Sequence, residues 1–307
     1  MAKLSQKTKH KKLNHWEPFD VAVTIIALLV CFITIYPMWY VICMSISEPL
    51  AASRGEVTFY PVGLSIESYK IVFENKDFWV GIRNSVLYVI AGCCLMLFTT
   101  VCVAYPLSRP NLKGRKFLNT YLLIPMYFGG GLIPYFLVVT RLGLYNNPLA
   151  LILPGSFSIW NIIMCRTFFQ TSIPKELSEA AMLDGASNMQ ILRKIILPLA
   201  KPIIAVILIY TVVGIWNSWF DASIFTTDKA IQPVQMFLRR VLVQQGSATQ
   251  SMAGMTAEIQ QAMAQLQMSN RQLRYSMIVI VTAPILAVYP MFSKYFTKGV
   301  VMGSLKG

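Results

Sequence analysis

The feature that most constrains this chain is the recurrence of apolar segments long enough to cross a lipid bilayer. A transmembrane helix needs about 20 mostly apolar residues, and six segments meet that requirement. Of the 307 residues, 55% are hydrophobic and 13% are charged, against about 25% charged in an ordinary soluble domain. We therefore predict an all-α polytopic membrane protein with six transmembrane helices, at residues 21–44, 82–105, 117–139, 149–169, 203–220 and 275–296.

The third predicted span contains a strong signal for a break in the helix. Gly129, Gly130 and Gly131 are followed by Pro134. Each glycine costs a helix about 1 kcal/mol relative to alanine, and the proline removes a backbone hydrogen bond. Irregular backbone at membrane depth is tolerated only where it faces protein or water. The break therefore either lines a polar pathway or allows close helix packing.

The placement of charge indicates how the spans are oriented. With an even number of spans, both termini lie on one side of the membrane. That side holds 17 of the 27 Lys and Arg residues with 5 acidic residues, and the other side holds 10 with 8 acidic residues. Cytoplasmic loops carry an excess of Lys and Arg, so we predict cytoplasmic termini. The segments on this side are residues 1–20, 106–116, 166–202 and 294–307.

The basic tail, residues 1–20, has a topological explanation. Its lysines between Lys3 and Lys12 fit the cytoplasmic side of a membrane, and we prefer this to nucleic-acid binding. The apolar run at 21–44 is longer than the roughly 7 to 15 residues of a cleaved signal peptide. We therefore keep it as a span and assign residues 21–307 to a single transmembrane domain.

The six cysteines give no indication of a metal site. All lie in predicted helices and lack metal-ligand spacing, so we expect reduced packing residues and predict no metal ligands. The cysteines are Cys31, Cys43, Cys93, Cys94, Cys102 and Cys165.

Two asparagines fall at apolar depth in the predicted spans. Asn161 lies in the fourth span, and Asn217 follows Trp216 in the fifth. A buried amide in lipid must find a partner. Each asparagine therefore either joins helices or contacts a polar solute.

The predicted external loop at residues 221–274 is long enough to carry a function. Loops of this length without secondary structure are usually functional or disordered. Residues 256–268 predict a helix within it, with Thr256 as N-cap. The loop is either a docking surface or a solvated connector.

The segment from Glu179 to Pro198, EAAMLDGASNMQILRKIILP, is an island of charged and small residues between two predicted spans. Pro174 suits the first turn of a helix, and Gly185 would end that helix. Residues 186–195 would form a second helix, and Pro198 would lead into the next span. We predict two short helices joined by a glycine turn on the cytoplasmic face.

This island resembles the EAA motif of ABC importer permeases. The matching residues are Glu179-Ala180-Ala181, Gly185, and Ile195-x-Leu197-Pro198. The flanking SIPKELSEAAMLDGAS and LPLAKP are similar to the carbohydrate-uptake branch, as are FYPVGLSIESY, NSVLYVIAG, AYPLSR and the tail KYFTKGVVMGSLKG. GGGLIP and IQPVQMFLRRVL most resemble permeases for complex oligosaccharides, the lipoprotein or polysaccharide-transport subgroup. The resemblance covers nearly the whole chain.

The resemblance implies a type I importer (MetI-like) fold in a bacterial cell membrane and a transporter subunit without enzyme activity. The chain lacks a G-x-x-x-x-G-K-[ST] phosphate loop, so ATP and Mg²⁺ would be used by two copies of a partner ATPase and no cofactor by this chain. A second, related permease would pair with it. An external solute-binding protein would deliver an oligosaccharide.

The resemblance also implies residue roles. Coupling helices at residues 174–197 would seat in the ATPase, with coupling residues Glu179, Ala180, Ala181, Asp184, Gly185, Ile195, Leu197 and Pro198. Aromatic, amide and hydroxyl groups near mid-membrane would contact the sugar, and our candidates are Tyr88, Tyr127, Asn161, Trp216 and Asn217.

Other classes fit the sequence less well. A membrane enzyme would need a catalytic cluster, yet both histidines, His10 and His15, lie in the basic tail. A secondary transporter would leave the island unexplained and often carries intramembrane charges. Within the importer class, an amino acid, polyamine or phosphate stays an alternative cargo.

Overall fold

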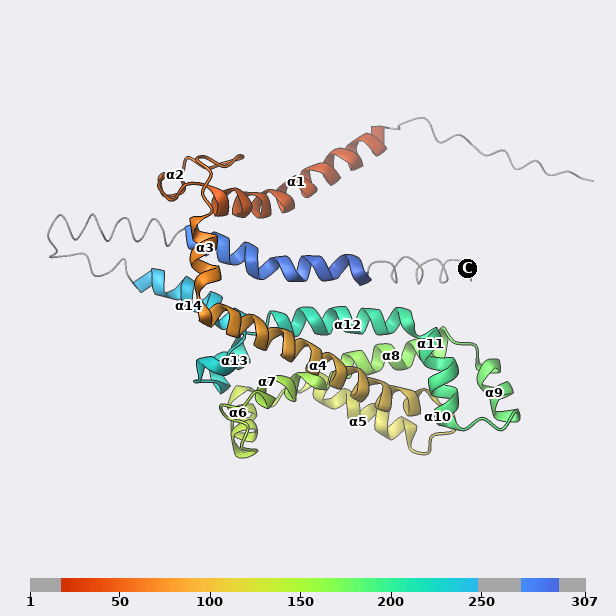
Figure 1. Ribbon diagram of the computed structural model, residues 1–307. Helices are drawn as coiled ribbons and strands as arrows, with labels where there is room; N and C mark the ends of the chain where they lie inside the picture. The colour runs from red at the N-terminus through yellow and green to blue at the C-terminus, as the bar shows by residue number, and fades with distance from the viewer. Residues whose placement is uncertain (1–17, 248–271, 293–307) are drawn as a thin grey trace, which may run out of the picture.

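The computed structural model describes residues 18–247 and 272–292 and shows an all-helical protein (Figure 1). Within these ranges the one β-type pairing is an isolated bridge between Ser47 and Leu64. The prediction of an all-α chain is confirmed for this part of the protein. The helix predicted at residues 256–268 lies outside the described residues.

Three continuous helices are long and apolar enough to cross a membrane. They are α1 (Pro18–Ile46), α4 (Lys76–Ser108) and the helix Gln272–Phe292. They correspond to the first, second and sixth predicted spans, although the last of these predicted spans extends beyond Phe292. α1 and α4 are longer than predicted because an apolar helix continues until its capping signals, such as Asn75 before α4, whose side chain accepts a hydrogen bond from the backbone of Asp77.

Three further segments are long and apolar enough to cross a membrane only when two helices, bent relative to each other, are counted as one span. The first pair, α5 (Arg115–Tyr127) and α6 (Leu132–Arg141), is bent by 112°. Its break contains Gly129 to Gly131, and Gly131 has a φ of +82° that favours glycine. The break predicted from the three glycines is therefore confirmed.

The other two pairs bend less sharply. α7 (Leu149–Ile152) and the 3₁₀ turn η1 (Pro154–Ser156) meet α8 (Ile159–Thr171) at 41°. The segment Asn188–Leu199 meets α12 (Lys201–Trp216) at 76°. The helix of the fifth predicted span therefore ends at Trp216, and a separate short helix, α13 (Phe220–Phe225), follows it.

Helix α4 is the central packing element. It contacts α8, α12 and α14 (Val234–Ser247). One apolar cluster joins α4, α8 and α12 to the helices before α12, and includes Ala104, Ile162, Ile191 and Ile207. Burying these side chains ties the segment that contains the island directly to the bundle.

Small and hydroxyl residues let α4 and α14 approach closely at the other end. A Cβ on Gly81 would lie 3.0 Å from the Cα of Val234. The backbone N–H of Val234 donates to Ser85 Oγ at 2.9 Å. This contact fixes α14 against the start of α4.

Polar contacts hold the last helix and α1 together near α3 (Glu67–Glu74). Ser276 Oγ lies 2.6 Å from Ser68 Oγ and 3.0 Å from the carbonyl oxygen of Ser45. Gln272 Nε2 donates to the carbonyl oxygen of Ser47. Segments more than 200 residues apart in the sequence are joined there.

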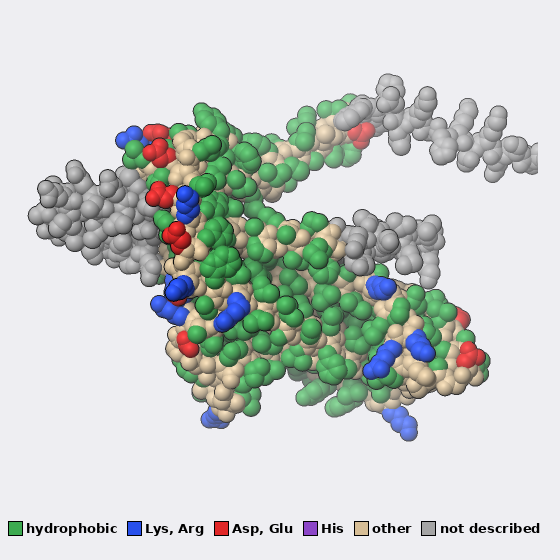
Figure 2. All heavy atoms as spheres, viewed as in Figure 1, with side chains coloured by type: hydrophobic (Ala, Val, Ile, Leu, Met, Phe, Trp, Pro, Cys, Tyr) green, Lys and Arg blue, Asp and Glu red, His purple; other side chains and the backbone are tan. Residues whose placement is uncertain are grey.

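The bundle has two distinct ends. α9 (Lys175–Leu183) and α10 (Asn188–Ile191) lie at the same end as the start of α1 and the end of the helix Gln272–Phe292 (Figure 1). α2 (Pro49–Arg54), α3, α6, α13 and α14 lie at the opposite end. Charged side chains gather at both ends, and hydrophobic side chains cover the surface between them (Figure 2).

Candidate functional site

The island forms two short helices joined by a tight turn. α9 ends at Leu183, and Gly185 follows in the left-handed conformation with a φ of +78°. The N–H of Gly185 donates to the carbonyl of Met182 at 3.1 Å, and that of Ala186 to the carbonyl of Ala181 at 2.9 Å. These bonds satisfy the last carbonyls of α9, and glycine takes this conformation without steric cost.

The second helix begins later than the sequence suggested. Ser187 caps α10 and forms a reciprocal capping box with Gln190, so the helix starts at Asn188 and not at residue 186. The hydroxyl of a capping serine binds a free backbone N–H group of the first turn. A π-helical turn, η2 (Leu192–Ile196), follows, then α11 (Leu197–Leu199) leads to α12.

Residues 175–191 comprise α9, the Gly185 turn and α10, and we call the surface that they form the bracket. Its inner side is anchored, because Ser178 and Ile191 are buried. The exposed coupling residues predicted from the sequence are Glu179, Ala180, Asp184, Gly185 and Pro198, and the half-buried ones are Ala181, Ile195 and Leu197.

Four large apolar side chains on the bracket were missed by sequence reasoning. Leu183 is 90% exposed, and Leu177, Met182 and Met189 are also exposed. Large apolar side chains in an otherwise polar segment mark a docking surface when they lie together. The signal available in the sequence was their position beside the motif residues.

A second group missed by sequence reasoning connects the bracket to α4. Tyr105 Oη donates to the carbonyl of Asn188 at 2.9 Å, and Arg109 Nη2 donates to Tyr105 Oη at 3.0 Å. The Arg109 guanidinium also lies 4.6 Å from the centre of the Tyr105 ring. Together with Ser178 and Glu179, these residues line a cavity of ≈ 620 Å³ between the bracket and the end of α4.

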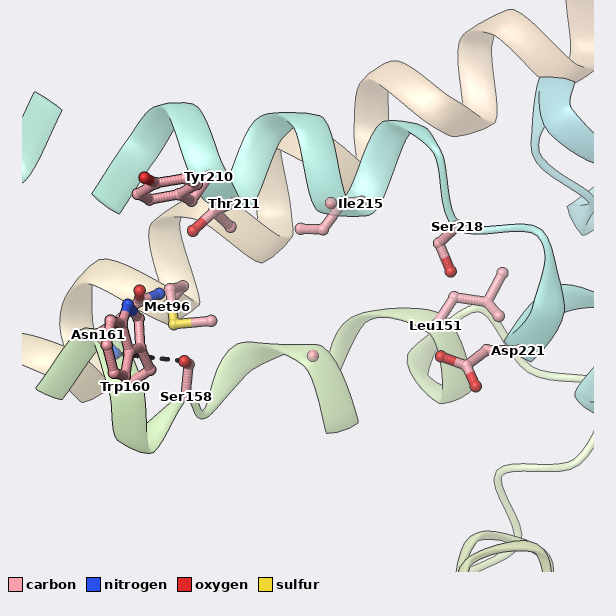
Figure 3. A pocket seen from close by; sticks show the side chains of 12 residues that line it. Met96, Leu151, Ser158, Trp160, Asn161, Tyr210, Thr211, Ile215, Ser218 and Asp221 are labelled. Atoms are coloured by element: carbon pink, nitrogen blue, oxygen red, sulfur yellow. Dashed lines mark hydrogen bonds between the residues drawn. The ribbon is translucent and has the colours of Figure 1, made fainter. Parts of the chain in front are cut away.

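A separate, open cavity of ≈ 420 Å³ lies between α4, α7, α8, α12 and α13 (Figure 3). Trp160, Asn161 and Tyr210 lie at one end of it, and Ser218 and Asp221 lie at the other. In the described part of the chain, no three His, Cys, Asp or Glu side chains form a metal-binding cluster. Aromatic faces with a few hydroxyl, amide and carboxylate groups suit a polar organic solute.

The cavity is shaped by a bend and a cap. Ser158 caps α8, and its Oγ accepts a hydrogen bond from the backbone N–H of Asn161 at 3.3 Å. The cap fixes the start of α8 beside the bend, so that Trp160 and Asn161 line the cavity (Figure 3). Burial raises the pKa of the Asp221 carboxyl above its ordinary value.

The five residues predicted to contact a sugar do not lie together. Asn161 lines the cavity. Tyr88 and Trp216 are buried, and each donates to a backbone carbonyl, Tyr88 Oη to Ile231 at 2.6 Å and Trp216 Nε1 to Val281 at 3.0 Å.

The remaining two candidates are exposed. Tyr127, 74% exposed, ends α5. Asn217 follows α12 and accepts a hydrogen bond from Gln235 Nε2 at 3.3 Å. Because spacing alone does not tell which face of a helix meets a cavity, sequence reasoning missed the other polar and aromatic cavity residues, which are Ser158, Trp160, Tyr210, Thr211, Ser218 and Asp221.

A bundle with bilayer-length helices, a helical bracket at one end and a cavity lined by aromatic and polar side chains fits the membrane component of a transport system. The chain belongs to the family described as binding-protein-dependent transport system inner membrane component, which matches residues 18–302. The resemblance to ABC importer permeases is thereby confirmed. The protein is a membrane-embedded transporter subunit.

Similar proteins cover nearly the whole chain. Protein LplC of Bacillus subtilis (strain 168) is 36% identical over 94% of this chain and 95% of its own length. The polygalacturonan/rhamnogalacturonan transport system permease protein YtcP of the same strain is 32% identical over 94% of this chain and 98% of its own. A solved bacterial ABC transporter involved in the import of the acidic polysaccharide alginate has a chain of 32% identity and a TM-score of 0.80, covering 91% of this chain and 96% of that one.

Proposed function

We propose that this chain is the permease subunit of an ATP-driven, binding-protein-dependent importer of oligosaccharides. The observation that carries the proposal is the bracket, because it presents the EAA motif as an exposed, firmly anchored surface at one end of the bundle. A separate ATPase, present in two copies, would dock there and use ATP and Mg²⁺. This chain would bind no cofactor.

The proposed topology has six spans with both termini in the cytoplasm. Three continuous helices and three bent pairs of helices would provide the spans. The bracket, the start of α1 and the end of the helix Gln272–Phe292 lie at the same end of the bundle (Figure 1). This arrangement supports a shared cytoplasmic side. Residues 1–20 would form the cytoplasmic tail.

The coupling role of the bracket follows from its anchoring and its exposure. Tyr105, Ser178 and Ile191 connect it to the bundle, so a push on the bracket moves α4 and the helices leading into α12. Glu179 would pair with a basic residue of the ATPase, and Leu183 would add apolar contact. Closure of the ATPases would then move helices as near-rigid levers.

The other predicted coupling residues support the same movement from inside the segment. Gly185 provides the turn, and Asp184 precedes it. Ile195 lies in the π-helical turn, and Leu197 with Pro198 begins the short helix before α12. π-helical turns are often found at functional sites. We propose that this turn absorbs part of the movement, while Ala180 and Ala181 allow close approach of the ATPase.

The proposed cargo is a sugar, because the relatives' names refer to polysaccharide transport and the cavity offers aromatic and hydrogen-bonding groups. Asn161 is the sequence-predicted candidate that lines the cavity, and we add Trp160, Tyr210 and Ser218 to it. The candidates that stay predictions are Tyr88, Tyr127, Trp216 and Asn217.

Two further partners complete the proposed importer. A second, related permease would form the other half of the path. A solute-binding protein would dock at the end opposite the bracket, near α13, α14 and the loop at 221–274, because this end would face the outside in the proposed topology.

Reconstitution tests the proposal. The chain is purified with its ATPase and partner permease and placed in liposomes with ATP on the side of the ATPase and binding protein with labelled oligosaccharide on the other. We expect transport of the label only when ATP and binding protein are both present. Accumulation without ATP would indicate a secondary transporter and contradict the proposal.

A further inference from the structure

The cavity between α8, α12 and α13 contains one formally charged side chain. Among its lining residues, Asp221 is the single Asp, Glu, Lys or Arg. The others that carry polar groups are hydroxyl, amide and indole side chains. Asp221 therefore sets the electrostatic character of this cavity.

The Asp221 carboxylate is half-buried, and no hydrogen bond or salt bridge includes it within the described ranges. Tyr135 of α6 lies close enough for its hydroxyl to interact with the charge of Asp221. Burying a carboxylate without a hydrogen-bond partner is costly, and burial raises the pKa of this carboxyl. Its acceptor sites are therefore available to a ligand.

Asp221 belongs to the short helix α13 and makes no capping hydrogen bond in it. It lies in the first turn of α13, where a helix dipole favours an acid. α13 has only six residues, and its N-terminus has no side-chain cap bond. The side chain lies beside Leu151 at the Ser218 end of the cavity (Figure 3).

The two ends of the cavity complement the surface of a sugar. Trp160 and Tyr210 are 57% and 60% exposed and offer ring faces at one end. Asn161 provides an amide beside them, and Ser218 with Asp221 provides hydrogen-bonding groups at the other end (Figure 3). A carboxylate accepts hydrogen bonds from hydroxyl groups and repels anions.

We propose that Asp221 is a specificity-determining residue that accepts hydrogen bonds from the hydroxyl groups of an uncharged saccharide and excludes saccharides that carry carboxylates. The inference rests on the proposed function and deepens it by naming the substrate class. The inferred cargo differs from the acidic polysaccharide alginate named for the similar solved transporter and from the polygalacturonan named for YtcP.

A ligand-binding experiment without transport tests the inference. The chain is assembled with its partner permease and ATPase in nanodiscs at pH 7.5, without ATP or binding protein. Saturation-transfer NMR then measures weak binding of galactotriose, of trigalacturonate with the same linkages, and of spermidine. The wild type is compared with Asp221→Asn and Asp228→Asn.

The control substitution removes the same charge outside the cavity. Asp228 is exposed and caps a 3₁₀ turn by accepting a hydrogen bond from the N–H of Ala230 at 2.8 Å. An asparagine retains that acceptor oxygen, so the turn is preserved. Co-elution with the ATPase checks that each variant assembles.

We expect the wild type to bind galactotriose and to discriminate against trigalacturonate. Asp221→Asn should strengthen trigalacturonate binding by about tenfold, the effect of one unit charge at roughly 10 Å and an effective dielectric constant of about 20. Asp228→Asn should behave as the wild type.

Several results would overturn the inference. They are equal binding of both sugars by the wild type, an unchanged ratio in Asp221→Asn, the same change in Asp228→Asn, no transfer to galactotriose, or selective binding of spermidine. A separate measurement in the same nanodiscs, with ATP added, tests the proposed function. If that function is wrong, the rate of ATP hydrolysis will not change when the binding protein is added.

Discussion

Substitution of Gly185 tests the bracket at its turn. Among the described residues, no atom lies within 4 Å of the position that a Cβ would take there, and the φ is +78°. The cost of a substitution therefore comes from the backbone and not from a clash. A left-handed conformation costs an L-residue about 1–2 kcal/mol, and about 1.4 kcal/mol is a tenfold change in an equilibrium.

We expect the amount of sugar transported per ATP to fall as the residue at 185 tolerates the turn less well. Gly185→Ala should lower the ratio by up to about tenfold, and Gly185→Val should lower it further because a β-branched residue is a poorer fit to positive φ. Gly185→Asn should lose less, since asparagine visits this conformation more readily. The assay measures labelled sugar uptake and phosphate release in the same proteoliposomes.

Gly114 supplies a matched control for this experiment. It has a φ of +75° and open space around its Cβ position within the described structure, and it precedes α5 outside the bracket. Gly114→Val therefore introduces similar local strain at another turn. Wild-type coupling in Gly185→Val, or equal loss in Gly114→Val, would refute the reasoning.

Three further predictions concern stability. Gly81→Ala should lower the thermal midpoint of the purified complex by forcing α14 away from α4, since the new Cβ would lie 3.0 Å from the Cα of Val234; an unchanged midpoint would contradict this. Ser187→Ala removes the capping box with Gln190 and should cost about 1 kcal/mol, seen as faster amide exchange at the start of α10, whereas unchanged exchange would argue against the cap. Burial raises the pKa of Asp221 in the folded protein, so the stability of the fold should fall as pH rises through that pKa. Asp221→Asn should therefore raise the thermal midpoint at neutral pH and lose this advantage below the ordinary pKa of an aspartic acid. A lower thermal midpoint of Asp221→Asn at neutral pH would contradict this prediction.

The helical architecture was predictable because lipid leaves few options for a chain of this composition. Long apolar runs predict helices, and the glycines at 129 to 131 predicted the break between α5 and α6. Gly185 predicted the turn between α9 and α10. These features depend on local backbone preference, which the residues at each position express directly.

The candidate solute site was less predictable because it depends on which helix faces meet. Tyr88 and Trp216 combine aromatic and polar character, but the fold uses their polar atoms to bind backbone carbonyls. Tyr210 and Asp221 gave no distinct signal along the chain, yet both line one cavity because α12 ends at Trp216 and α13 starts as a separate helix beside it. The tertiary packing of the helices, and not residue type, determines which side chains line the cavity.

The central claim is that the bracket transmits motion between an ATPase and the sugar path, and substrate-stimulated ATP hydrolysis tests it most directly. The rate is measured in nanodiscs with and without binding protein and oligosaccharide, for the wild type and Glu179→Ala. We predict stimulation of the wild type and its loss in Glu179→Ala, while galactotriose binding is retained. Wild-type hydrolysis that ignores both binding protein and sugar, or full stimulation in Glu179→Ala, would contradict the account.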